Sequence, residues 1–231
     1  MKPLDRGEQG IRSSLFTVLA LAIFAGGAHA GTVRGTISVP PPQGGNDYAP
    51  NPYPGRASSL PGANHPPYGH VTDAVIYVEG LNEAVASALK GNPSGKVLAQ
   101  KDQAFSVRVL PCAVGTTVDF PNMDPIFHNV FSVSPTKRFD LGKYPKGHSR
   151  QVTFRKPGLV PVFCDIHPSM ACFILVLSNR AFTQPDSSGA YALPDLPAGT
   201  YQIKIWHPDF EEATRTVQVP ETGEVTLDVS L

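Results

Sequence analysis

Three side chains able to bind a soft metal ion follow one another at three-residue steps in the sequence, namely Cys164, His167 and Met170. A thiolate, imidazoles and a weakly held thioether favour copper, and one Cys with two His and a long axial Met is the arrangement of blue-copper electron-transfer sites. The set lacks a second imidazole. His128 stands at the start of an apolar run upstream, and we expect it to supply that imidazole. The sequence thus predicts one copper site made of four side chains.

Each of these residues has a simpler explanation when taken alone, as a buried histidine, a disulfide cysteine or a core methionine. Their combination favours metal binding, because the chain has only three methionines and one of them is Met1. Met123 is a less suitable axial ligand, since it lies in the turn-like stretch Pro121-Asn-Met-Asp124. Zinc is the competing metal, because one Cys and two His with an open position form a catalytic zinc set. A thioether is a poor zinc ligand, so the sequence predicts copper.

The sequence does not favour a copper enzyme. It contains no His-x-His pair, which the trinuclear centre of a multicopper oxidase needs, and no Cys-x3-Cys, which a binuclear site needs. For a zinc enzyme, no carboxylate apart from Asp165 or Asp124 is placed for general-base work. We therefore expect a protein that is not an enzyme.

The stretch of about 107–177 resembles the cupredoxins, and its short step between the last two ligands is similar to that of amicyanin. The wider pattern is similar to plastocyanin-like proteins labelled as methylamine-utilisation proteins. The resemblance implies one type 1 copper ion held by His128, Cys164, His167 and Met170. It also implies that the Asn129 side chain ties the two ligand loops together. The segments that carry the resemblance are Phe120-Pro-Asn-x-Asp124, His128-Asn-Val-Phe-Ser132, Phe139-Asp-Leu-Gly142 and Cys164-x-Ile-His-Pro-Ser-Met170.

The function that the resemblance implies is the transfer of single electrons. Electrons would leave through the imidazole edge of His167, across an apolar rim that we expect to contain Pro125, Ile126, Ile166 and Pro168. The expected partners are redox proteins, and amine oxidation is one candidate source of electrons, on the family label alone. Two alternatives stay open: a copper carrier or sensor for which the metal is cargo, and a metal-free adhesion or carbohydrate-binding protein built on the C-terminal residues.

The residues around the ligands are predicted to form short β-strands with hardly any helix. Apolar and polar residues alternate in segments that Gly, Pro and Asn separate. Such a series predicts an all-β fold, a Greek-key sandwich like that of the cupredoxins, over residues 31–180. The expected strands are 31–40, 73–79, 105–110, 116–120, 129–134, 151–155, 159–164 and 171–177, with a short helix at 81–89.

Residues 181–231 carry a second β pattern, with two Gly turns between Asp186 and Ile205 and further strands at 212–219 and 224–231. This part resembles the carboxypeptidase regulatory-like, transthyretin-like β-module. The matched stretch is shorter than a full module, because the usual first strands are missing from it. It is therefore either a small sandwich packed on the first domain, or a module that the strand at 31–39 completes.

Two segments are not expected to belong to either sandwich. Residues 1–30 have the pattern of an export signal, with basic residues, the apolar run Leu15 to Phe24 and the cleavage site Ala28-His-Ala30. The run is shorter than the roughly twenty residues of a membrane span. We expect cleavage after Ala30, a periplasmic protein and no membrane span in the mature chain. Residues 40–70 hold nine prolines and five glycines, so we expect disorder, with His65 and His70 as solvated loop residues.

The mature chain is almost neutral, with sixteen basic and seventeen acidic residues, which gives no indication of nucleic-acid binding. Residues 137–156 nevertheless hold seven basic residues against Asp140, whereas residues 181–231 hold eight acids and two bases. These are either solvated faces or, for the basic stretch, a surface that steers an acidic redox partner. The oligomeric state cannot be read from the sequence.

Two cysteines remain if Cys164 binds metal, namely Cys112 and Cys172. In the topology that the resemblance implies, the strand ending at Cys112 runs parallel to the strand that begins at Cys172. The two residues then lie at opposite ends of the strand pair, beyond the limit of about 7 Å between the Cα atoms of a disulfide. We expect two buried free thiols.

Overall fold

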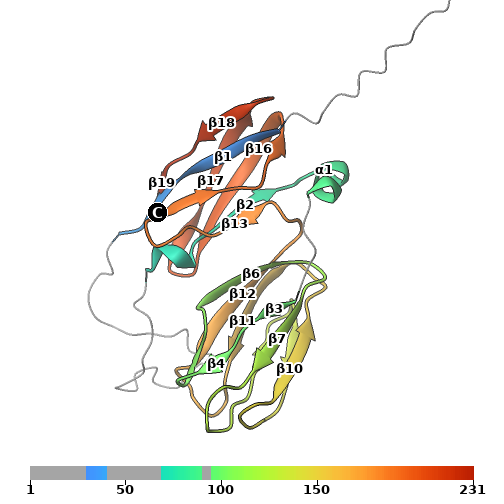
Figure 1. Cartoon of the computed structure of the whole chain (residues 1–231), viewed down its shortest axis with the longest axis vertical. Coiled ribbons are helices and arrows are strands. Elements are labelled where there is room, and N and C mark those ends of the chain that lie inside the picture. Colours follow the sequence, from blue (N-terminus) through green and yellow to red (C-terminus); the bar gives the residue numbers. More distant parts are fainter. Residues whose placement is uncertain (1–29, 41–68, 90–94) are drawn as a thin grey trace, which may run out of the picture.

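The computed structural model describes residues 30–40, 69–89 and 95–231, which form two β-domains (Figure 1). The expected signal and the expected disordered segment fall almost wholly outside the described residues. Among the described residues, no helix has the length and apolar character needed to cross a bilayer. The all-β class expected from the sequence is confirmed: the described helices are α1 (Glu83–Ala88) and the 3-10 turn η1 (Val71–Asp73).

The first domain is a sandwich of two sheets. One sheet has the order β6-β12-β11-β8-β9 and the other β10-β7-β3, and a short β4–β5 hairpin lies beside them. β6 and β12 are parallel, whereas β12, β11, β8 and β9 are antiparallel neighbours. The strands are β3 (Lys96–Val97), β4 (Gln100–Lys101), β5 (Ala104–Phe105), β6 (Val109–Ala113), β7 (Thr117–Pro121), β8 (Phe131–Val133), β9 (Arg138–Asp140), β10 (Ser149–Thr153), β11 (Gly158–Phe163) and β12 (Ala171–Leu177).

The core of this domain comes from the alternate residues that face inward from both sheets. The buried cluster contains Val118 and Phe120 of β7 together with Val160 and Val162 of β11, and all four are fully buried. Cys164 and Met170, which follow β11 and precede β12, belong to the same buried cluster. The metal-ligand loop is therefore anchored in the core at one end of the sandwich.

The second domain contains strands from both ends of the chain. One sheet is centred on β1 (Ala30–Ser38), which pairs with β14 (Ala190–Ala192), β15 (Leu196–Pro197), β18 (Gly223–Thr226) and β19 (Val229–Ser230). The other has the order β13 (Phe182–Thr183), β2 (Val75–Glu79), β16 (Gly199–His207) and β17 (Phe210–Val219). Of the two alternatives given for residues 181–231, the pairing agrees with the one in which the strand predicted at 31–39 completes the module.

This pairing differs from the expected boundaries of 31–180 and 181–231. β1 and β2 lie in the sheets of the second domain, and the first domain is inserted between α1 and β13. The alternation within a strand tells which face is buried, but it does not tell which sheet the strand joins. The predicted boundaries followed sequence order, and they therefore placed β1 and β2 in the first domain.

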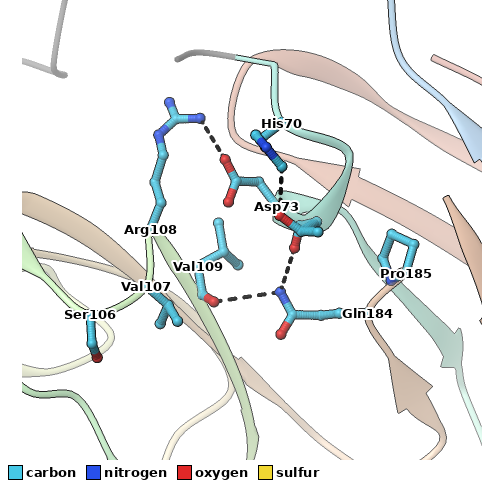
Figure 2. A pocket seen from close by; sticks show the side chains of 9 residues that line it. His70, Asp73, Ser106, Val107, Arg108, Val109, Gln184 and Pro185 are labelled. Carbon is cyan, nitrogen blue, oxygen red and sulfur yellow. Dashed lines mark hydrogen bonds and ion pairs between the residues drawn. The ribbon is translucent and has the colours of Figure 1, made fainter. Parts of the chain in front are cut away.

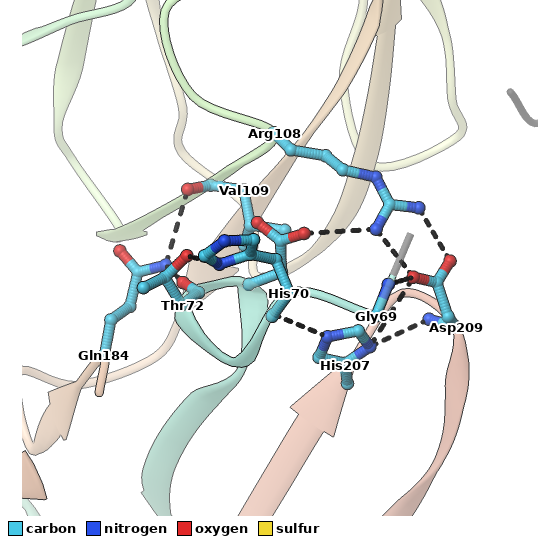
Figure 3. Close-up of polar contacts among 9 residues, drawn as sticks. Gly69, His70, Thr72, Arg108, Val109, Gln184, His207 and Asp209 are labelled. Atoms are coloured by element: carbon cyan, nitrogen blue, oxygen red, sulfur yellow. Dashed lines mark hydrogen bonds and ion pairs between the residues drawn. The ribbon is translucent and has the colours of Figure 1, made fainter. Parts of the chain in front are cut away.

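A mixed polar and apolar seam joins the two domains. Arg108, just before β6, donates to Asp73 at 3.1 Å and to Asp209 at 2.6 and 2.7 Å (Figure 3). The Phe173 ring of β12 lies edge-on to Trp206 of β16, with ring centroids 6.1 Å apart. An open pocket of about 360 Å³ lies at this seam, with His70, Asp73, Arg108 and Gln184 among its lining residues (Figure 2).

The two remaining cysteines lie far apart on neighbouring strands. Cys112 is in register with Val176, four residues along β12 from Cys172, which corresponds to about 13 Å at the rise of a β-strand. Cys112 and Cys172 are both free and buried, as expected. Burial raises the pKa of the Cys112 thiol to about 12, so this thiol stays protonated at neutral pH.

Candidate metal centre

His128 lies in the segment between β7 and β8 and is fully buried. Its backbone forms a two-way bridge with Tyr144: the His128 amide donates to the Tyr144 carbonyl at 3.3 Å, and the Tyr144 amide donates back at 3.0 Å. Next to this bridge, the Leu141 amide donates to the carbonyl of Val130. The backbone of the histidine is thereby fixed from the loop that follows β9.

Cys164, His167 and Met170 lie in the short loop that joins β11 to β12. The last pair of the ladder is Phe163 with Ala171. Beyond it, the Cys164 amide donates to the Met170 carbonyl at 3.2 Å, and the Met170 amide donates to the His167 carbonyl at 2.9 Å. Because these bonds fold the loop back on itself, its three ligand side chains share one end of the sandwich with His128.

The ligand atoms of three residues converge. The two Nδ1 atoms of His128 and His167 are 3.1 Å apart, and the Cys164 Sγ lies 3.9 Å from the first and 3.8 Å from the second. Bonds of about 2.0–2.1 Å to nitrogen and about 2.3 Å to sulfur, as for Zn²⁺, require separations of about 3–4 Å between ligand atoms. The three atoms therefore suit one shared metal ion.

Met170 completes the predicted set and is 1% exposed, in the same buried cluster as Cys164. With one thiolate, two imidazoles and a thioether, the cluster has the composition typical of a type 1 copper site. The thioether of Met170 favours copper over zinc, because zinc is bound by Cys, His and carboxylate ligands, whereas soft thioethers bind copper.

The other imidazole nitrogen of His128 is held by a carboxylate. His128 Nε2 lies 2.7 Å from Asp124 Oδ2, and both residues are buried. Burial by itself would raise the pKa of Asp124, but the Gln103 amide, His128 and the Asp102 amide hydrogen-bond to the carboxylate and lower it overall. Asp124 is therefore an ionised acceptor next to a predicted metal ligand.

His167 is only partly buried, so part of this residue reaches the surface. Burial and the neighbouring His128 lower the pKa of His167, although Asp124 and Asp165 act in the opposite direction. The imidazole is thus kept neutral, which is the form that binds a metal ion.

The four apolar residues that the sequence predicted for the rim lie on the two ligand segments. Pro125, Ile126, Ile166 and Pro168 are all exposed. The structure adds two residues that the sequence reasoning did not include, because Met123 is 53% exposed and Phe127 is 56% exposed. Such exposed apolar groups on two adjacent ligand loops are typical of an interaction surface.

The predicted role of Asn129 is not seen among the described residues. Asn129 is 4% exposed, but its Oδ1 atom has no hydrogen-bond partner there. Asn122 instead joins the His128 segment to the loop after β9, because its side-chain amide donates to the carbonyls of Ile126 at 2.8 Å and Tyr144 at 2.9 Å. The sequence offered a hint of this in the Asn-x-Asp spacing, since Asn122 Oδ1 also accepts from the Asp124 amide at 2.9 Å.

Comparisons with known proteins agree with the two-domain composition. Residues 175–231 match the family model of the carboxypeptidase regulatory-like domain. A search of curated proteins finds no significant match.

Several solved copper proteins are similar to part of the chain. A copper-containing nitrite reductase from Thermus scotoductus SA-01 is 29% identical over 36% of this chain and 22% of its own length, with a TM-score of 0.35. A purple cupredoxin from Nitrosopumilus maritimus is 22% identical over 36% of this chain and 99% of its own, with a TM-score of 0.32. Amicyanin from Paracoccus versutus is 21% identical over 44% and 97%, with a TM-score of 0.34.

The ligand cluster and the family model are independent observations on different parts of the chain. Together they describe a β-domain with a His-Cys-His cluster, inserted in a module whose C-terminal residues are similar to the carboxypeptidase regulatory-like domain.

Proposed function

We propose that this chain is a type 1 copper protein that carries single electrons between redox partners and is not itself an enzyme. His128, Cys164 and His167 would be the strong ligands, and Met170 the weak axial one. The observation that carries the proposal is the convergence of two Nδ1 atoms and one Sγ within 3.1–3.9 Å at a buried end of the sandwich.

The protein's own contribution is to hold these ligands in place before and after a change of charge. Bound copper would supply a centre that gains or loses one electron. Core packing of Cys164 and Met170, and the backbone bridge from Tyr144 to His128, restrict movement of the ligands. A ligand set that both copper oxidation states accept without rearrangement supports fast electron transfer.

We further propose that electrons pass through the exposed edge of His167 to a partner protein. The docking surface of this partner would have an apolar centre bordered by acidic residues. The loop of residues 144–148 lies beside the segment that carries Pro125 and Ile126. The backbone amide of Asn122 donates to the His148 carbonyl, and the Gly147 amide donates to the Asn122 carbonyl. Lys146 in this loop is exposed, and Lys143 lies 3.8 Å from Asp165, next to Ile166. Positive charge therefore borders the apolar rim.

The compartment and the upstream reaction are part of the same proposal. A periplasmic location rests on the export pattern of residues 1–30, which lies almost wholly outside the described residues. Amine oxidation as the source of electrons rests only on the resemblance to methylamine-utilisation proteins.

A spectrum of the copper-loaded protein tests the proposal. The chain beginning at Gly31 should develop an intense visible band from thiolate-to-copper charge transfer, which ascorbate bleaches and oxidation restores. Cys164→Ala should abolish the band, whereas Cys112→Ala, which removes an equally buried thiol outside the cluster, should keep it. Copper that binds without the band, or that a chelator removes within seconds, would instead indicate a copper carrier or sensor.

A further inference from the structure

We propose that Asp124 and the two-residue turn Asp102–Gln103 are positioning residues that fix the tautomer and orientation of the His128 ring. The Asp124 carboxylate accepts a hydrogen bond from Nε2–H, and the lone pair on Nδ1 is thereby directed at Cys164 and His167. Only the copper measurements given below depend on the proposed function, because the tautomer is a property of the metal-free protein.

The geometry that carries this inference is a buried carboxylate with three N–H donors. Asp124 Oδ2 lies 2.7 Å from His128 Nε2 and accepts from the Gln103 amide at 2.9 Å, while Oδ1 accepts from the Asp102 amide at 2.6 Å. Asp124 is 5% exposed and His128 is fully buried. Backbone amides can only donate hydrogen bonds, so the two turn amides hold both oxygens of Asp124 as acceptors. The imidazole must therefore carry its proton on Nε2, which leaves Nδ1 without one in the neutral ring.

The two amide donors come from an unusual turn. β4 and β5 pair Lys101 with Ala104, so Asp102 and Gln103 form a two-residue hairpin turn. Their φ angles are +55° and +58°, as a type I′ turn requires at both positions. Glycine or asparagine normally occupies such positions, and Gln103 is neither. The turn nevertheless adopts this conformation, and in it both amides point at one carboxylate.

The same carboxylate is held on its backbone side. The Asp124 amide donates to Asn122 Oδ1, and the Asn122 side chain donates to the carbonyls of Ile126 and Tyr144. Tyr144 in turn pairs with the backbone of His128. The carboxylate and the imidazole are therefore attached to one hydrogen-bonded frame, so the ring orientation does not depend on a bound metal.

Asp124→Asn is the direct test. In the unaltered chain, each carboxylate oxygen accepts at least one hydrogen bond from the hairpin amides or from Nε2. The asparagine side chain replaces one of these oxygens by an NH2 group, which then faces a donor and breaks part of the arrangement. In the metal-free protein, ¹⁵N NMR of the His128 ring should show the Nε2–H tautomer in the unaltered chain and a substantial Nδ1–H population in the variant. An unchanged tautomer in a folded Asp124→Asn variant would overturn the inference.

Two variants of the turn provide a second test that leaves Asp124 intact. Gln103→Gly keeps both amides and suits a positive φ, so it should keep the tautomer. Gln103→Val places a β-branched residue at a φ it strongly disfavours, so it should raise the Nδ1–H population. If Asp124→Asn does not fold, this pair decides the matter, and equal tautomer populations in the two variants would refute the role of the turn.

The copper measurements separate this inference from the proposed function. Asp124→Asn should weaken copper binding by about 10–100-fold, the usual effect of losing a partner of a metal-bound histidine, and shift the reduction potential to a more positive value. Asp140→Asn is the control for charge alone, because Asp140 is exposed on β9 and lies outside both ligand segments. It should leave copper affinity within about twofold. Failure of the unaltered chain to bind copper would refute the proposed function, while the tautomer result would still stand or fall by itself.

Discussion

The Nδ1 atoms of His128 and His167 lie 3.1 Å apart, although 39 residues separate them in the chain. If both rings carry their proton on Nε2, two lone pairs face each other beside the Cys164 sulfur. That arrangement is repulsive in itself and becomes favourable when a cation shares the lone pairs. The fold thus brings together groups whose mutual contact needs an ion to be stable.

Metal binding should therefore raise the stability of the folded chain. An ion that binds only the folded state contributes about 2.7 kcal/mol when its free concentration is 100 times the dissociation constant. Thermal unfolding should shift upward on adding copper, and His128→Ala should remove the shift. His148→Ala is the matched control, because His148 is exposed. An equal shift in both variants would show that the ion binds elsewhere.

The cluster itself could be predicted from the sequence because its parts are local. Cys164, His167 and Met170 lie on one loop between two predicted strands, and the strand at 171–177 has the predicted bounds. His128 required a long-range assumption, namely that the segment before β8 lies beside the end of β11. The structure agrees, since Phe131 of β8 pairs with Phe163 of β11.

Other features had no local signal. The turn at Asp102 and Gln103 lacks the Gly or Asn that marks a type I′ hairpin, so neither the hairpin nor its link to Asp124 was predicted. The strand predicted at 105–110 is β5 and β6 instead, interrupted at residues 106–108, and Arg108 in this interruption pairs with Asp73 of the second domain. β9 was missed because it lies in a Pro-, Gly- and Lys-rich connection.

Arg108 should be important for holding the two domains together. Its side chain is 10% exposed, and it pairs with Asp73, which is 9% exposed, and with Asp209. Removing one partner of a buried ion pair leaves uncompensated charge and costs about 3–5 kcal/mol. Arg108→Ala should therefore lower the free energy of unfolding by about that amount in a urea titration.

The control for Arg108 is an ion pair on the surface of the second domain. Arg34 and Glu224 are 2.8 Å apart, and each side chain is 51% exposed. Surface pairs contribute about 0–1 kcal/mol, so Arg34→Ala should have little effect. Equal losses from the two substitutions would show that burial does not determine the contribution of Arg108.

Acid should weaken the second domain through His207. This histidine is 2% exposed; its Nε2 donates to the His70 carbonyl at 3.1 Å, and its Nδ1 accepts from the Asp209 amide at 3.1 Å. Burial lowers its pKa below the ordinary 6.5, although the His70 carbonyl and Asp209 oppose the shift. The unfolded chain then binds the proton more readily, so stability is complete above about pH 6.5 and falls as the pH drops through the lowered value.

His207→Gln isolates this contribution, because glutamine can still donate to the His70 carbonyl but does not titrate. The free energy of unfolding of the metal-free protein should fall less steeply below about pH 6.5 in the variant than in the unaltered chain. Parallel curves for the two proteins would assign the acid sensitivity to other groups.

The positive charges beside the apolar rim should control the rate of electron transfer with charged reagents. Lys143 and Lys146 are exposed on the loop that borders the ligand segments. Positive charge concentrates an anion near the exposed edge of His167, so the reduced copper protein should react quickly with hexacyanoferrate(III) at low ionic strength. The double variant Lys143→Glu with Lys146→Glu should react about tenfold more slowly, an effect within the usual range of electrostatic steering. At about 1 M salt, where the Debye length is about 3 Å, the two proteins should react at similar rates.

Arg34→Glu changes charge by the same amount per site on the other domain and should leave the rate nearly unchanged. If the Lys variant reacts as fast as the unaltered chain at low salt, electrons leave from a face that these lysines do not border.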